Sequence, residues 1–288
     1  METLNSTNKK RWHTLLTFGF VAIGAVGSMI ALMSASGEAS KDMAATWQSG
    51  ALRYLPNIAF GYGEKLNFDV NYKFITAGKA VMQIASKPET ISDRPTYSVQ
   101  FTVRTTSSFD NVFKVRDRYQ TYIDIDGIFP WRFEQSVKEG NYSRDFSAII
   151  DQRAKKAKTT EGSFTTPPFV HDILSAMYYV RTLNLSAMKK GQSITLQNFY
   201  GKKTHDLRIR VLGKEKIETD AGTFNCVVVE PMVVEGGLFK NEGRIVVYMT
   251  DDDRKIPVKV SSKVVIGSID GELTSYSGTR GPVTAKVN

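Results

Sequence analysis

The sequence predicts a mainly β protein whose antiparallel strands form curved sheets or half-barrels, lipocalin-like or sandwich-like, with one long helix in mid-sequence. Three observations lead to this fold class. Apolar and polar residues alternate with a period of two in many short segments, which indicates strands with one face on a core and one in water. These segments recur about every 8 to 12 residues with turn residues between them, as in barrels and sandwiches. A single long segment has helical spacing of its apolar residues.

The clearest strand covers residues 65–74. Its apolar members, each separated from the next by one polar residue, are Leu66, Phe68, Val70, Tyr72 and Phe74. Strict alternation of this kind fits a half-buried strand and fits a helical period poorly. Ala77-Gly78 interrupts the pattern, and a second strand with alternating apolar residues follows over 80–84.

The same alternation predicts four more strands before the helix, over residues 97–103, 119–125, 131–137 and 142–150. The turn cluster Glu139-Gly140-Asn141 makes the last two a hairpin. After the helix, strands are predicted over residues 193–199, 205–212, 214–219, 224–230, 243–250, 255–262, 264–269 and 272–276. Gly236-Gly237 separates two of them, and Asp270-Gly271 predicts a two-residue hairpin between the last two.

The helix is predicted over residues 168–188. Apolar residues recur at helical spacing from Val170 to Val180, after Pro167-Pro168 and before Lys189-Lys190-Gly191. Prolines in the first turn and lysines followed by glycine at the end are typical start and stop signals. A lone amphipathic helix in a β protein is expected to plug the sheet or pack against it.

The elements predict one β-rich domain over residues 63–276, which the helix could divide into two halves, 63–165 and 190–276. Residues 37–62 are predicted to be an irregular lead-in, and 277–288 a tail. About 250 residues remain after the first 36, enough for a sizeable core.

The N-terminus predicts export. Lys9, Lys10 and Arg11 precede the uncharged stretch 14–33, and small residues follow it. This is the pattern of a signal peptide over residues 1–36, with cleavage after Ser36 or Ala39. An uncleaved inner-membrane anchor is the alternative, because about 20 apolar residues can span a bilayer. Either way we expect a periplasmic location.

The chain carries a formal net charge of +9, and removal of the first 36 residues leaves +7. Such a basic exported protein could meet phospholipid headgroups, lipopolysaccharide or anionic glycans, or an envelope protein. It could equally be a soluble domain that happens to be basic. Nucleic acid is disfavoured by the compartment and by the lack of a recognisable binding motif.

No catalytic, metal-binding or cofactor signature occurs in the sequence. Cys226, the single cysteine, lies in an apolar strand and is predicted to be a buried thiol. His171 is predicted to be a surface or hydrogen-bonded histidine, and Asp172 to interact with the start of the helix. Asp124 and Asp126 are predicted to face water at a strand end, and 251–253 to form a charged turn.

Aromatic residues at the alternating positions of the first half are the candidate ligand-binding residues. They are Phe68, Tyr72, Phe74, Phe101, Tyr119, Trp131 and Phe133. In a barrel or strongly curved sheet, inward-facing aromatic side chains can line a cavity for an acyl chain or another apolar ligand. The competing interpretation is that they only fill the core.

An ordered series of motifs resembles the bacterial family catalogued as domain of unknown function 3108. The motifs are GEKLNFDVNYKFITAGKA from Gly63, HDILSAMYYVRTL with Asp172, Tyr178 and Arg181, EKIETDAGTFNCVVVEP, and MTDDDRKIPVKV with Asp253 and Pro257. The resemblance covers residues 60–275. It implies an exported β-rich domain of a cell with an outer membrane and supplies no catalytic residues, because the family has no established activity.

Three functions follow as hypotheses. The first is a non-enzymatic envelope protein that binds a lipid or another amphiphile, or assists envelope assembly. The second is a structural or adaptor module that binds protein or cell-wall glycan through exposed sheet edges. The third is a polysaccharide hydrolase, for which two of Asp124, Asp126, His171 and the acids of 251–253 would have to converge in one cleft.

Overall fold

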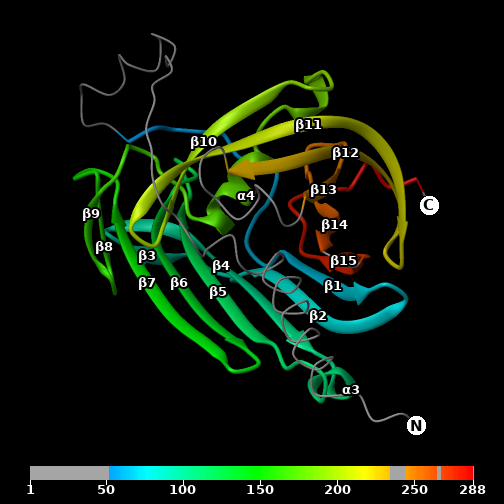
Figure 1. The fold of residues 1–288 in the computed structure, drawn as a ribbon. Coiled ribbons are helices and arrows are strands. Elements are labelled where there is room, and N and C mark those ends of the chain that lie inside the picture. Colours follow the sequence, from blue (N-terminus) through cyan, green and yellow to red (C-terminus); the bar gives the residue numbers. More distant parts are fainter. Residues whose placement is uncertain (1–51, 234–243, 265–266, 288) are drawn as a thin grey trace.

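The computed structural model describes residues 52–233, 244–264 and 267–287. The predicted signal peptide and Gly236-Gly237 lie outside the described residues. The mainly β, antiparallel fold class is confirmed, and the strands belong to one large sheet that does not close (Figure 1). Its strands are β1 (Lys65–Tyr72), β2 (Ile75–Ile84), β3 (Glu89–Ile91), β4 (Arg94–Thr105), β5 (Arg116–Asp124), β6 (Pro130–Glu139), β7 (Tyr142–Asp151), β8 (Lys156–Thr159), β9 (Gly162–Thr165), β10 (Ser193–Tyr200), β11 (Lys203–Thr219), β12 (Gly222–Val233), β13 (Ile245–Thr250), β14 (Pro257–Val264) and β15 (Gly267–Ser277).

The sheet consists of two meanders that join at the first and last strands of the chain. Strands β1 to β9 follow one another across the sheet, with β3 paired to β4 at the side, and β10 to β15 do the same. Strand β15 pairs with β1, with Leu66 opposite Tyr276 and Tyr72 opposite Ile269. The two sequence halves are therefore continuous through the hydrogen bonds of one ladder.

The two free ends of this sheet, β9 and β10, approach each other without pairing. The rings of Phe164 in β9 and Phe199 in β10 have centroids 6.1 Å apart. The chain on its way to the helix occupies part of this gap. The His171 amide donates to the Gln197 carbonyl at 2.8 Å, and the Phe199 amide donates to the His171 carbonyl at 2.7 Å.

Within residues 52–233, 244–264 and 267–287, two short helical elements, α3 (Ser107–Asp110) and η1 (Leu185–Ala187), accompany one longer helix, α4 (Ile173–Arg181). The prediction of a helix in this region is confirmed, but 168–188 was too long. Asp172 caps the N-terminus by accepting hydrogen bonds from the Leu174 and Ser175 amides. This extended cap marks the start of the helix, and residues 168–171 precede it and are not helical.

Helix α4 lies inside the curved sheet and contributes to both parts of the core (Figure 1). Leu174 and Tyr178 belong to a large cluster with the first-half strands, and Phe224 and Leu273 of the second half join that cluster. On a different side of the helix, Ala176 and Val180 pack in a smaller cluster with strands β10 to β13. The helix therefore fills the interior that the sheet alone would leave open.

The predicted hairpin at Asp270-Gly271 is wrong. Both residues lie inside β15, where Asp270 pairs with Asn71 and Gly271 with Val70. Gly271 does not have the positive φ that a two-residue turn of this type requires. The predicted strands 205–212 and 214–219 are likewise one strand, β11, with a register shift between Val211 and Gly213.

Candidate ligand pocket

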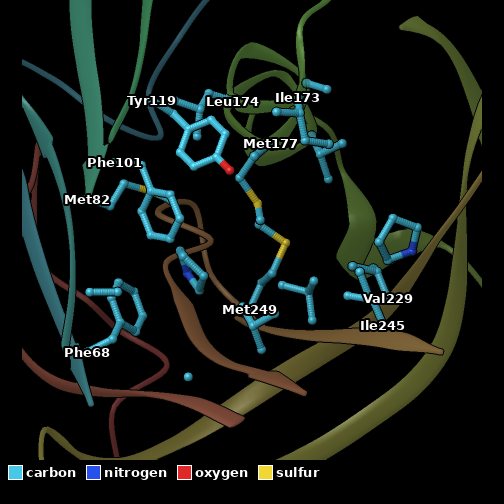
Figure 2. Close-up of a pocket in the computed structure, with 18 of the residues that line it drawn as sticks. Phe68, Met82, Phe101, Tyr119, Ile173, Leu174, Met177, Val229, Ile245 and Met249 are labelled. Atoms are coloured by element: carbon cyan, nitrogen blue, oxygen red, sulfur yellow. The ribbon is translucent and has the colours of Figure 1, made fainter. Parts of the chain in front are cut away.

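A cavity of about 150 Å³ lies between helix α4 and strands from both halves of the sheet (Figure 2). Its wall is formed by Phe68, Val70, Ala80, Met82, Phe101, Tyr119, Ile173, Leu174, Ala176, Met177, Val180, Leu207, Ile209, Val229, Pro231, Ile245, Val247, Met249, Pro257, Val260 and Gly271. The alternation of β1, β2 and β11 to β13 places every second residue on this wall. The pocket is therefore a direct product of the strand periodicity.

Three methionines reach the pocket from three different elements. Met82 comes from β2, Met177 from α4 and Met249 from β13, and the side chains of Met177 and Met249 approach each other across it (Figure 2). Methionine is unbranched and polarisable, so that it adapts to ligands of varied shape. The three methionines therefore make the wall of this pocket adaptable in shape.

Three of the seven aromatic residues predicted as ligand-binding line this pocket. Phe68, Phe101 and Tyr119 lie together on its first-half wall (Figure 2), and the rings of Phe101 and Tyr119 have centroids 6.1 Å apart. Each is at most 9% exposed. These three residues therefore face the cavity, and their role in binding a ligand stays a prediction.

The other four lie away from the pocket. Trp131 and Phe133 are buried in the core, where the Trp131 indole N–H donates to Asp124 at 2.9 Å. Tyr72 is half-buried at the end of β1. The expectation that Phe74 faces inward is wrong: it is 103% exposed in the turn between β1 and β2. Strand β1 ends at Tyr72, so the side chains beyond it no longer alternate between the two faces of the sheet.

Tyr119 is the one described lining residue whose side chain carries an O–H or N–H group. Its hydroxyl points towards the centre of the pocket (Figure 2). It is buried and has no hydrogen-bond partner among the described residues. Burial is the main cause that raises the pKa of Tyr119 well above its usual value, and the nearby acids Asp117 and Glu139 raise it further. The group is therefore a neutral O–H donor.

A polar patch continues from Tyr119 along the inner faces of β5 and β6. Gln135 lies opposite Tyr119 in the ladder, and Asp117 precedes Tyr119 by two residues on the same face. Asp117 Oδ2, Gln135 Oε1 and both carboxyl oxygens of Glu139 are buried. The carboxyl groups of Asp117 and Glu139 share a hydrogen bond, whereas Gln135 Oε1 has no partner within the described chain. Burial raises the pKa of Asp117 and Glu139, and the proximity of Asp117 raises that of Glu139 further.

The start of helix α4 is fixed by a buried polar network. Asp172 Oδ2 accepts a hydrogen bond of 2.6 Å from the Thr121 hydroxyl of β5, while its Oδ1 caps the helix. His171 is 2% exposed, with Nδ1 3.3 Å from Ser175 Oγ and Nε2 3.3 Å from Arg53 Nη2. Burial and the Arg53 charge lower the pKa of His171, so the ring is neutral. The predicted dipole interaction of Asp172 takes the form of a cap.

The end of the helix is fixed by a fully buried ion pair. Arg181 donates to both carboxyl oxygens of Glu64 at 2.6 and 2.7 Å, and its Nε donates to the Arg254 carbonyl at 3.1 Å. The guanidinium also lies over the rings of Phe60 and Tyr178. Both ends of α4 are therefore attached to the sheet or to the lead-in, which holds its pocket-facing side in place.

The acids considered for hydrolysis are occupied by structural contacts. The expectation that Asp124 faces water is wrong, because its side chain is 0% exposed and accepts from Arg94 Nε at 2.8 Å and from Trp131. Asp126 pairs with the same arginine at 2.7 Å. In the charged turn after β13, Asp251 pairs with Lys214 at 2.7 Å. None of these groups lines the pocket.

Cys226 is buried, as predicted, and burial raises the pKa of its thiol to about 12. A thiol with this pKa is protonated at neutral pH and is a poor nucleophile. Within the part of the chain that the structure describes, no group of three or more histidine, cysteine or acidic residues could hold a metal ion.

Sequence reasoning missed more than half of the pocket wall. The residues from α4 and from β11 to β13, among them Met177, Val229 and Met249, belong to segments far from the aromatic strands. Their alternation and helical spacing signalled burial. Nothing in their local pattern showed that they face the same cavity as Phe68.

The family model described as Protein of unknown function (DUF3108) matches residues 67–274. No curated protein matches the chain. Among solved structures, a beta-barrel-like protein of domain of unknown function DUF1849 from Brucella abortus has 12% identity and a TM-score of 0.50, covering 76% of this chain and 99% of its own. At 12% identity this likeness shows the fold alone.

Two further structures are similar at lower TM-scores. A candidate lipoprotein from Parabacteroides distasonis has 10% identity and a TM-score of 0.33, covering 79% of this chain and 100% of its own. A candidate exported protein with a YmcC-like fold from Bacteroides fragilis has 11% identity and a TM-score of 0.29, with the same coverage. As for membrane spans, the described residues contain no helix with the length and apolar character needed to cross a bilayer.

Proposed function

The chain belongs to the DUF3108 family, whose description assigns no activity, and we propose that it is a non-enzymatic cell-envelope protein that binds a lipid or another amphiphile. The observation that carries the proposal is the pocket beside helix α4. Its wall is apolar apart from one tyrosine hydroxyl and draws on both halves of the sheet.

The wall suits an acyl chain. Each methylene group transferred from water into such a wall contributes about 0.8 kcal/mol, so a chain gains affinity steadily with the length that enters. The three methionine side chains permit a flexible chain to be accommodated in more than one conformation. A catalytic site would need groups that move protons or bind charge, and the lining supplies Tyr119 alone.

The envelope location rests on the sequence. The signal peptide predicted over residues 1–36 would deliver the domain across the inner membrane, and the uncleaved anchor would hold it there. The net charge of +7 on the remaining chain favours contact with anionic headgroups, lipopolysaccharide or anionic glycan. A lipid pocket in a domain of net positive charge is compatible with traffic between lipid surfaces.

The two other hypotheses receive less support. An adaptor module would bind protein or glycan through the sheet edges, and this adaptor function stays a prediction. A hydrolase would need two of its candidate acids in one cleft. Asp124 and Asp126 share Arg94, while Asp251 is tied to Lys214 in a different turn.

Native mass spectrometry after mild purification tests the proposal, together with thermal shifts caused by phospholipid and by lipopolysaccharide. We expect the wild type to retain an amphiphile and Met177→Trp to lose it, because the indole ring fills the pocket. Met232→Trp is the matched control, since Met232 is half-buried in β12 but does not line the pocket. No retained ligand and no thermal shift for the wild type would overturn lipid binding.

A further inference from the structure

The hydroxyl of Tyr119 is the feature that the proposed function does not use. It is 3% exposed, projects into the pocket (Figure 2), and lacks a hydrogen-bond partner among the described residues. A buried hydroxyl left unpaired is destabilising, and native proteins pair such groups with protein, water or ligand. A donor in this position is expected to serve whatever occupies the pocket.

The position of this hydroxyl is fixed by the sheet. Tyr119 sits in mid-strand, opposite Gln135 on β6, and its ring packs against Phe101 of β4. A tyrosine ring has few rotatable bonds, so little entropy is lost when its hydroxyl meets a partner. The site is therefore preorganised for one hydrogen bond in an otherwise apolar wall.

The surroundings of Tyr119 select the kind of partner. Asp117 and Glu139 lie on the same inner face, and Gln135 presents a buried carbonyl oxygen without a partner in the described chain. A carboxylate or phosphate placed here would lose its hydration in a pocket whose lining contains no basic side chain, which is unfavourable. A neutral oxygen acceptor meets no such penalty.

We propose that the ligand carries a neutral oxygen acceptor along its apolar part, as an ester-linked acyl chain does, and that Tyr119 donates a hydrogen bond to this oxygen. This inference rests on the proposed function. The charged head of the amphiphile stays outside the apolar pocket. Tyr119 thereby determines specificity for acyl esters over plain alkyl chains of the same length.

The test compares two probes that differ in one carbonyl group: ester-linked lysophosphatidylcholine and its ether-linked analogue of equal chain length. A neutral hydrogen bond contributes about 0.5–1.5 kcal/mol, so we expect the wild type to bind the ester roughly 2- to 12-fold more tightly. Tyr119→Phe should bring this ratio to about one, with little change in affinity for the ether.

Tyr122→Phe is the matched control. Tyr122 lies on the same strand but outside the pocket lining. Its substitution by phenylalanine also removes a phenolic hydroxyl group. We expect it to keep the wild-type ratio. Tyr119→Phe should also leave the thermal midpoint of the ligand-free protein unchanged or raised, because it removes an unpaired buried group. A lowered midpoint would indicate a structural role and contradict the inference.

The outcomes separate the two proposals. If the wild type binds ester and ether equally, or if Tyr119→Phe keeps the preference, the inference is overturned while lipid binding stands. If the wild type binds neither probe, nor any retained amphiphile, the proposed function fails and the inference fails with it.

Discussion

The pair formed by Glu64 and Arg181 shows how single residues hold this interior together. Both side chains are at most 1% exposed, and Arg181 anchors the end of α4 to the start of the sheet. Removing one member of a buried pair leaves the other charge uncompensated, which costs about 3–5 kcal/mol. We therefore expect Glu64→Gln to lower the free energy of unfolding by about that amount in denaturant titrations.

The control for this prediction is the pair Asp69–Lys79, whose lysine side chain is 68% exposed. Exposed pairs contribute about 0–1 kcal/mol, so Asp69→Asn should change the free energy of unfolding very little. Similar effects of the two substitutions would show that the buried pair does not hold the helix as inferred.

The buried acids Asp117 and Glu139 predict a dependence of stability on pH. Burial raises the pKa values of both acids in the folded protein, and the neighbouring Asp117 raises that of Glu139 further. The folded state then retains protons that an unfolded aspartate or glutamate loses above about pH 4. The stability that these two acids contribute is fully present below that pH, and it is lost as the pH rises through their raised folded-state pKa values.

We therefore expect the free energy of unfolding to be less sensitive to rising pH in Glu139→Gln than in the wild type. The glutamine side chain does not titrate, so this substitution abolishes the difference in proton binding between the folded and unfolded states at position 139. Denaturant titrations between pH 7 and 9, where neutral His171 does not titrate, measure this difference. Asp145→Asn, an exposed site on β7, is the control and should follow the wild type. Parallel curves for all three proteins would refute the prediction.

Among the elements, α4 depends on its cap. Asp172 satisfies the Leu174 and Ser175 amides and the Thr121 hydroxyl at once. Loss of a cap costs about 0.5–2 kcal/mol, and leaving a buried hydroxyl unpaired adds about 1–3 kcal/mol. Asp172→Ala should therefore destabilise the protein in denaturant titrations by about 2 kcal/mol or more. Asp172→Asn keeps a side-chain acceptor and should recover part of this loss; equal losses would contradict capping as the cause.

The elements whose side chains alternate could be predicted from the sequence because alternation reports burial directly. Leu66 and Phe68 are buried in β1 as expected, and Glu139 to Tyr142 form the expected hairpin between β6 and β7. Alternation fails where a tertiary contact overrides the local pattern. Asp124 is buried because Arg94 and Trp131 satisfy it, and both come from other strands.

The candidate site could be predicted only in part for a related reason. Phe68, Phe101 and Tyr119 were found through their alternation within neighbouring strands. That Met177 and Met249 face them depends on β15 pairing with β1, which folds the second half over the first. Strand periodicity carries no information about this long-range register. Gly271 illustrates the limit, since it resembles a turn residue but lies in that same ladder.

At the scale of the whole molecule, the two sequence halves are not independent bodies. They share the β1–β15 ladder, and the larger core cluster contains Phe224, Ile256 and Leu273 of the second half beside first-half residues such as Leu66. Neither half buries its apolar face alone, because α4 and the other half cover it. The structure therefore predicts that both halves unfold in one cooperative transition.

Two probes placed in different halves test this prediction. In a Trp12→Phe, Trp47→Phe variant, Trp131 is the remaining tryptophan of the chain and is 0% exposed, so that its fluorescence reports the first half. Cys226 is the single cysteine and is 1% exposed, so that the reaction of its thiol with a disulfide reagent reports the second. We expect both signals to change at the same denaturant concentration. Two separate midpoints would mean that the halves unfold independently, and that the pocket between them could open without loss of either half.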